Sequence, residues 1–137
     1  KTRTSASVFL SDYILSEEGE KQEVSNTISF KNTIIDGNFS QELQIDELEE
    51  SSLNVTFENC LLNMQKIEDL RFIDIIWNES ADFLSRKHPY NFNISSASPA
   101  KDMANKTISA SYIYDIEGKD RLLDELPDIG AYEYVED

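Results

Sequence analysis

The stretch Ile28-Ser-Phe-Lys-Asn-Thr-Ile-Ile35 has two near-copies in the chain, and the three together decide the expected fold. The copies are Val8-Phe-Leu-Ser-Asp-Tyr-Ile-Leu15, which begins 20 residues earlier, and Val55-Thr-Phe-Glu-Asn-Cys-Leu-Leu62, which begins 27 residues later. Self-similarity at a period of about 20 to 50 residues marks architectures built from stacked repeats. The sequence therefore predicts that equivalent columns of the three stretches lie one above another.

Each copy has the same internal pattern. Apolar residues alternate with polar ones, as in Ile28-Ser-Phe30, which is typical of a half-buried strand. A fixed Asn or Asp follows, and then comes an apolar pair. Asparagine tolerates left-handed backbone geometry, so Asn32 and Asn59 are expected at bends. In a parallel stack the two side chains would lie one above the other and form an amide ladder.

The segments between and after the copies are less regular. Residues 16–24 and 36–38 read as polar connections, and 41–52 as either a helical turn or a further strand. After Leu62 the repeat decays, although residues 71–77, 90–94, 107–114 and 129–134 favour strands and 81–86 favours a helical turn.

The net charge of the chain limits the kinds of partner that it can bind. The 137 residues include 27 acidic and 12 basic side chains, a net charge of −15. Nucleic acid and an anionic membrane surface are disfavoured, because both attract basic proteins. No apolar run is long enough to cross a bilayer. The acids are expected mainly to solvate the surface. The chain opens Lys-Thr-Arg without a leader pattern, and its first copy, at Val8, has no N-terminal cap. We therefore expect either the C-terminal portion of a longer protein or an open end that packs on a neighbouring chain.

No residue is assigned to catalysis or to a metal, and no cofactor is expected. Cys60 lies among apolar neighbours and reads as a buried thiol, and His88 as an exposed loop residue. The two are too far apart to indicate zinc. The acid clusters at 46–50 and 115–120 match no calcium loop. Trp77 and the tyrosines serve either core packing or a sugar-stacking platform, and the binding residues stay unknown.

The tail carries a resemblance. It contains Ser98-Pro-Ala-Lys-Asp102, then Asp115-Ile-Glu-Gly-Lys-Asp-Arg121, then Asp128-Ile-Gly-Ala-Tyr-Glu133. This order resembles the C-terminal end of secreted right-handed parallel β-helix proteins of the pectate-lyase-like superfamily, common in Bacteroides-like bacteria. Upstream, Asp69-Leu-Arg-Phe-Ile-Asp74 resembles a segment of the same family, with Leu70 in place of a proline.

The resemblance implies a fold and a setting, but no activity. It implies a secreted or cell-surface protein on the outer-membrane side of a bacterium, and polysaccharide as a partner. For the tail itself we expect Ile129, with one or both of Tyr132 and Tyr134, to cover the last repeat. Gly130 is expected at a close backbone approach, and Arg121 in an ion pair with Asp128 or Glu133.

The predicted fold is therefore all-β: a short right-handed parallel β-helix of about three rungs in one domain. Residues 1–66 would form the rungs, and 67–137 the last coil and the C-terminal cap. The open end would meet missing N-terminal rungs or a neighbouring chain. The expected function is a non-catalytic structural or capping segment. The alternatives are a carbohydrate-binding module and a polysaccharide lyase or glycoside hydrolase.

Overall fold

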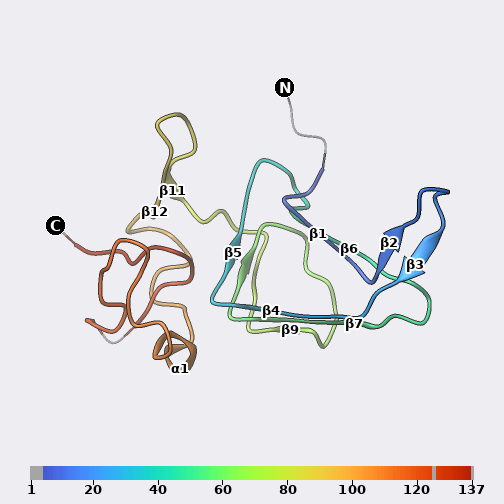
Figure 1. Cartoon of the computed structure of the whole chain (residues 1–137). Helices are drawn as coiled ribbons and strands as arrows, with labels where there is room; N and C mark the ends of the chain where they lie inside the picture. Colours follow the sequence, from blue (N-terminus) through green and yellow to red (C-terminus); the bar gives the residue numbers. More distant parts are fainter. Residues whose placement is uncertain (1–4, 125, 137) are drawn as a thin grey trace.

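The computed structural model describes residues 5–124 and 126–136, which form strands, turns and one short helix (Figure 1). The strands are β1 (Val8–Ser11), β2 (Tyr13–Leu15), β3 (Lys21–Glu23), β4 (Asn26–Lys31), β5 (Ile34–Ile35), β6 (Leu43–Asp46), β7 (Leu53–Glu58), β8 (Leu61–Leu62), β9 (Phe72–Ile73), β10 (Ile76–Trp77), β11 (Phe83–Ser85) and β12 (Asn91–Ile94), and the helix is α1 (Lys106–Ser109). The all-β class expected from the sequence is confirmed.

Two of the three copies pair as the repeat predicts. Strand β4 lies parallel to β7, with Ile28 beside Val55 and Phe30 beside Phe57. The rings of Phe30 and Phe57 stack with centroids 4.8 Å apart and planes 4° apart. That separation matches the spacing of neighbouring strands. The in-register columns are therefore real between these two copies.

The third member of this sheet is not the copy at Val8. Phe72 of β9 lies beside Phe57 on the other side of β7, and the two rings stack at 4.7 Å. The statement that the repeat decays after Leu62 is therefore wrong. Strand β1 pairs instead with β6, placing Val8 beside Leu43 and Leu10 beside Ile45. The alternation Leu43-Gln-Ile45 in the 41–52 segment thus marks a strand, because it offers β1 a matching apolar face.

A left-handed residue turns the chain after each strand of this sheet. Asn32, Asn59 and Asp74 have φ values of 46°, 50° and 52°. Polar side chains tolerate this conformation better than β-branched ones do, which confirms the expected bends. Past the bends the chain forms β5, β8 and β10, a second parallel sheet in which Leu61 lies beside both Ile34 and Ile76.

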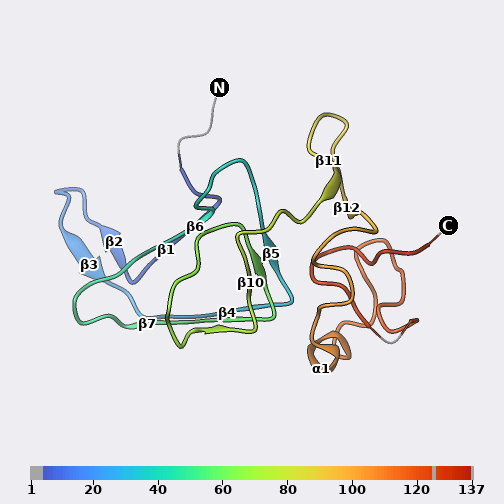
Figure 2. The same ribbon diagram turned by 180° about the vertical axis from the view of Figure 1, so that it is seen from behind.

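The predicted parallel β-helix is nevertheless wrong. The sheets contain two or three strands each, in the orders β1-β6, β4-β7-β9 and β10-β8-β5, and none continues as a solenoid. Two antiparallel hairpins, β2-β3 and β11-β12, interrupt the parallel pairing. The physical reason lies in the connections: the polar insertion after Leu15 folds back on its own strand, so the first copy never stacks on the second. Figures 1 and 2 show this hairpin projecting from the three-stranded sheet.

The main hydrophobic core lies between the small sheets. Its fully buried centre comes from β6, β7 and β8 and their flanks, and includes Leu43, Val55, Phe57, Cys60 and Leu62. Partly buried side chains of β1, β4 and β9 pack around this centre. The core is therefore layered: the middle strands are covered on both sides, and the outer strands on one.

A second core joins the tail (residues 98–134) to the rest of the chain. Leu61 turns to the outer face of the β5-β8-β10 sheet and packs with Ile94, Ala100 and Ile129. Ile34 and Ile76 lie against the same cluster. The expectation that Ile129 covers the last repeat is therefore wrong in its location, because the tail covers one face of a sheet. In Figures 1 and 2 it lies beside the β4-to-β5 bend.

Three local expectations also differ. Residues 129–134, expected as a strand, form none. Residues 81–86, expected as a helical turn, contain β11, which pairs with β12. Residues 107–114, expected as a strand, contain most of α1 instead. Asn105 caps that helix, since its Oδ1 accepts the N–H groups of Thr107 and Ile108. This N-cap satisfies donors that a helix end leaves free, so it overrides the strand propensity of the following residues.

Candidate functional site

Three strands, β1, β4 and β5, form what we call the open layer, because among the described residues each has a neighbouring strand on one side only. Strands β1, β4 and β5 each lie at the edge of their sheet. Val55 and Phe57 of the middle strand β7 are 1% and 0% exposed, whereas Ile28 and Phe30 of β4 are only partly buried. Within the described chain, the side chains of Ile28 and Phe30 therefore have no further strand packed beside them on the side away from β7.

The outer edge of β4 offers backbone N–H groups that no described strand pairs with, and of its outward carbonyls that of Lys31 accepts the Thr33 hydroxyl at 2.8 Å. The N–H of Asn32 donates to the carbonyl of Glu58 at 3.1 Å, which fixes which residues face β7. In a parallel ladder, alternate residues direct both backbone groups to the same neighbour. Ile28 and Phe30 thus face β7, and Thr27, Ser29 and Lys31 direct their N–H groups outward. Along the described chain, no strand pairs with this edge.

A cleft of about 800 Å³ runs beside the second half of this edge. One wall is Ser29 to Thr33, and the other includes Thr107 to Ser109, Ser111 and Tyr112. Arg121 and Gly130 line it as well. No acidic side chain contributes to this lining.

An asparagine cluster holds the far wall in place. The Oδ1 of Asn32 accepts the N–H of Asn105 at 2.9 Å, and its Nδ2 donates to the Ser109 hydroxyl at 3.1 Å. The Nδ2 of Asn105 donates to Oδ1 of Asn59 at 3.3 Å. Asn105 therefore links the two bend asparagines, and these bonds replace the direct amide ladder expected from the sequence.

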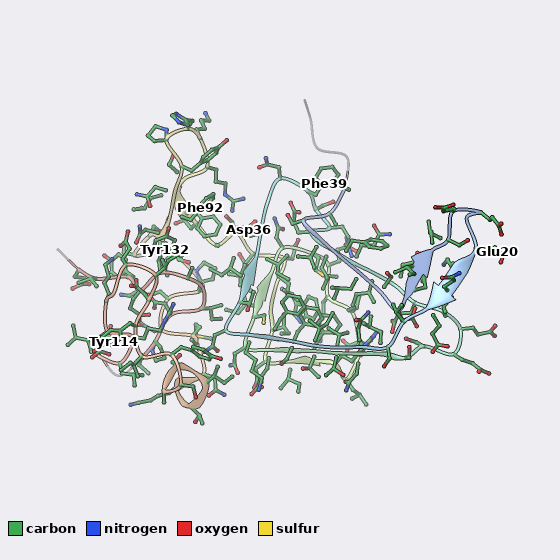
Figure 3. The ribbon with its side chains drawn as sticks, in the orientation of Figure 1. Glu20, Asp36, Phe39, Phe92, Tyr114 and Tyr132 are labelled. Carbon is green, nitrogen blue, oxygen red and sulfur yellow. The ribbon has the colours of Figure 1, made fainter. Side chains whose placement is uncertain are left out.

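A second groove of about 610 Å³ lies on the other side of the same bend. Its lining is mainly apolar and includes Phe83, Phe92, Ile116 and Tyr132. Figure 3 shows Phe92 of the β11-β12 hairpin close to Tyr132 of the tail. Tyr90 extends this surface, since its ring stacks on Phe92 with centroids 5.9 Å apart and planes 5° apart. Tyr90 is 63% exposed and Phe92 is 46% exposed.

A buried clasp fixes the tail. Arg121 donates to Oε2 of Glu133 at 3.3 Å and to the carbonyl of Gly130 at 2.8 Å. The Oε1 of Glu133 accepts the N–H of Asp128 at 3.1 Å. The expected ion pair of Arg121 is thus confirmed with Glu133, and charge-assisted bonds of this kind are among the stronger ones. Burial, and then the nearby Asp128, raise the pKa of Glu133 to about 7.

Gly130 confirms the expected close approach. Its N–H donates to the carbonyl of Asn32 at 3.0 Å, and its φ is +116°. A Cβ at this position would lie 2.7 Å from Cδ1 of Ile34. Glycine is therefore required both by the backbone angle and by the space against β5.

The remaining candidates of the sequence fall outside the clefts. Cys60 is fully buried, as expected, and burial raises the pKa of its thiol. His88 is exposed, with its ring 6.1 Å from that of Tyr90. Trp77 is half-buried against Phe72, at 5.2 Å between centroids, which places it in core packing and not on a sugar platform.

The acid clusters serve local structure. Glu47 pairs with Arg71 at 2.8 Å, and Oδ1 of Asp115 accepts the N–H groups of Glu117 and Lys119, both at 2.8 Å. A third cleft, of about 410 Å³, has an acidic lining that includes Glu133. Within residues 5–124 and 126–136, no group of three or more His, Cys, Asp or Glu is placed to hold a metal ion.

No helix in the described ranges is both long and apolar enough to cross a bilayer. No family model, curated protein or solved structure matches the chain. The resemblance of the tail to secreted parallel β-helix proteins therefore stays a prediction for its setting and has no independent support.

Proposed function

We propose that this chain is a non-catalytic structural module whose tail stabilises a small stack of parallel strands and whose open layer meets another polypeptide. A secreted or cell-surface setting, which the tail motifs imply, belongs to the same proposal. The observation that carries it is the placement of the buried charges. The buried carboxylates of Asp12, Glu42, Asp115 and Asp128 hold backbone segments together, and none of them lines the three clefts described above.

Four buried acids support this reading. The carboxylates of Asp12, Glu42, Asp115 and Asp128 each accept backbone N–H groups from segments distant in sequence or from a turn. Asp12, for example, accepts the N–H of Leu48 at 3.0 Å and that of Ser52 at 3.2 Å. Glycoside hydrolysis instead needs two carboxylates facing each other across the scissile bond. The linings of the cleft beside β4 and of the aromatic groove contain no acid. The enzymatic alternative would therefore need the acids of the third cleft, such as Asp102, Asp120 and Asp124.

The test of the structural proposal combines stability and activity. Arg121→Met keeps much of the side-chain volume and removes the charge that Glu133 faces. We expect it to lower the free energy of unfolding by about 2 to 4 kcal/mol, since breaking a buried pair leaves a charge uncompensated. Lys66→Met, which removes an ion pair with Glu68 that is far more exposed, is the matched control and should cost less than about 1 kcal/mol.

Activity decides between this proposal and the enzymatic alternative. The wild-type chain is incubated with acidic and neutral polysaccharides, with and without calcium, and release of unsaturated or reducing ends is measured. The proposal predicts no release above buffer. Release that disappears on substitution of a carboxylate would overturn it in favour of a lyase or hydrolase.

Carbohydrate binding is the second candidate, and one observation favours it. Tyr90, Phe92 and Tyr132 place aromatic rings along an open groove, and flat exposed rings pack well on the apolar faces of sugars. Tyr90→Ala and Phe92→Ala should each weaken retention on an immobilised polysaccharide. Tyr112→Ala, at an exposed tyrosine outside this groove, is the control and should leave retention unchanged. If none of the three substitutions changes retention, this candidate is refuted.

A further inference from the structure

We infer that the outer edge of β4 takes up an extended strand of another polypeptide, in parallel orientation, with apolar side chains over Ile28 and Phe30. This inference rests on the proposed structural function and names the partner of its open layer. The partner is defined by its chemistry: alternating apolar residues followed by a residue that tolerates a left-handed bend.

The burial of the columns gives the first argument. The rings of Phe30, Phe57 and Phe72 form one stack at the spacing of neighbouring strands. Phe57 is 0% exposed because it has a ring on each side, and Phe30 has one on a single side. A further strand with an apolar residue beside Phe30 would bury the exposed face of the Phe30 ring. Phe30 buries one face of the Phe57 ring in the same way.

The backbone gives the second argument. The N–H groups of Thr27, Ser29 and Lys31 face away from β7, at an edge that a strand can join by main-chain hydrogen bonds. Proteins usually protect such edges with proline, bulges, charged side chains or short strand length. Strand β4 has no proline, its pairing with β7 is free of register shifts, and its one charged residue, Lys31, is paired with Glu58 at 3.3 Å.

The opposite edge of the same sheet is protected. Strand β9 spans two residues, against six for β4. Arg71, which precedes it, is held between Asp69 at 2.7 Å and Glu47 at 2.8 Å. Short length discourages strand addition, because few backbone groups are left for a partner. The paired charge of Arg71 does not distinguish the two edges, since Lys31 on β4 is paired in the same way. The asymmetry points to β4 and not to β9 as the docking edge.

The cleft supplies room, and the existing register supplies the orientation. The open space beside Ser29 to Thr33 lies where the end of an added strand would run. Every strand pair of this sheet is parallel and keeps its apolar columns in register. A parallel partner extends the Phe stack directly. An antiparallel partner would place its aromatic residue over Ile28 when the pattern is that of β7.

Disulfide trapping tests the inference on the full chain. The probe is a synthetic peptide with the sequence of residues 53–62, carrying Asn54→Cys and Cys60→Ser. A parallel strand that continues the β4-β7 register places the new thiol beside Thr27, and an antiparallel one places it beside Lys31. The two chain variants are therefore Thr27→Cys and Lys31→Cys, whose side chains lie on the same exposed face. The buried native Cys60 stays in both.

The expected result is peptide capture by Thr27→Cys at a rate roughly fivefold above that of Lys31→Cys, the value of one aromatic pair. Replacing the peptide's Val55 and Phe57 by lysine should abolish the difference. Equal capture, faster capture by Lys31→Cys, or capture by neither would overturn the inference. The inference assigns the edge to a polypeptide other than this chain. Disulfide-linked dimers of a Ser29→Cys chain would assign the edge to a second copy and would therefore overturn it as well. None of these results depends on the polysaccharide assays, so the two proposals fail separately.

Discussion

Replacing Gly130 by alanine tests how the tail is fixed to the strands. The backbone at Gly130 has φ +116°, a conformation that costs a residue with a Cβ about 1 to 3 kcal/mol. The new methyl group would also lie 2.7 Å from Cδ1 of Ile34. Overpacking of this kind typically costs a further 1 to 3 kcal/mol, less where a flexible side-chain end can shift. We therefore expect Gly130→Ala to lower the free energy of unfolding by about 2 to 4 kcal/mol.

A second substitution separates the two causes. Ile34→Val removes the Cδ1 atom that the new methyl group would meet, while the backbone angle stays as it is. The double variant should therefore recover about 1 kcal/mol relative to the sum of the single changes. Urea unfolding followed by the fluorescence of Trp77, the one tryptophan of the chain, measures each corner of the cycle. A loss below about 0.5 kcal/mol for Gly130→Ala would refute the close approach. Full additivity would refute the clash and leave the backbone angle as the sole cause.

Three further predictions concern the core, the clasp and a bend. Phe57→Ala should cost about 3 to 5 kcal/mol in urea unfolding, because its ring is fully buried between two others, and Phe92→Ala, at an exposed ring, should cost far less. Glu133 has its pKa raised from 4.5 to about 7, so its contribution to stability is complete below pH 4.5 and is lost as the pH rises through 7. Between pH 4.5 and 8, wild-type stability should therefore fall by on the order of 3 kcal/mol more than that of Glu133→Gln, and parallel pH profiles would contradict this. Asn59→Ala should cost about 1 kcal/mol or more, since alanine disfavours a φ of 50°, and Asn59→Gly should cost less; the reverse order in thermal unfolding would contradict the bend.

The pairing of β4 with β7 could be predicted from the sequence, because two copies with the same alternation and the same bend residue can match column by column. The sequence alone did not predict that the copy at Val8, as strand β1, pairs with β6 and not with the second copy. That copy resembles the others, yet its 20-residue offset leaves the polar insertion free to form the β2-β3 hairpin. Strand β6 then offers an apolar face of equal length. Local pattern alone cannot rank two such partners, since both bury similar side chains.

Strands β9 and β10, which form the third layer, were not predicted as a further copy for a related reason. Phe72 and the bend at Asp74 follow the same pattern as Phe57 and Asn59, although only two residues of each strand pair. A search for full eight-residue copies therefore passes over them. The signal that marks them is shorter: an aromatic residue, one further residue, and a polar residue able to adopt positive φ.

The tail shows why an acidic composition is not only a matter of solubility. Residues 98–134 contain one helix of four residues and, among those described, no named strand, so most of their backbone donors lack regular partners. Buried N–H groups must nevertheless be satisfied. Asp115, Asp128 and Glu133 supply acceptors for six distinct backbone N–H groups. Arg121 offsets part of the negative charge gathered in this way, and burial beside Asp128 raises the pKa of Glu133. Carboxylates can thus take the structural role that β-ladders take elsewhere. The position of these acids, buried and pointing at backbone, is what separates them from the solvated surface that composition alone predicts.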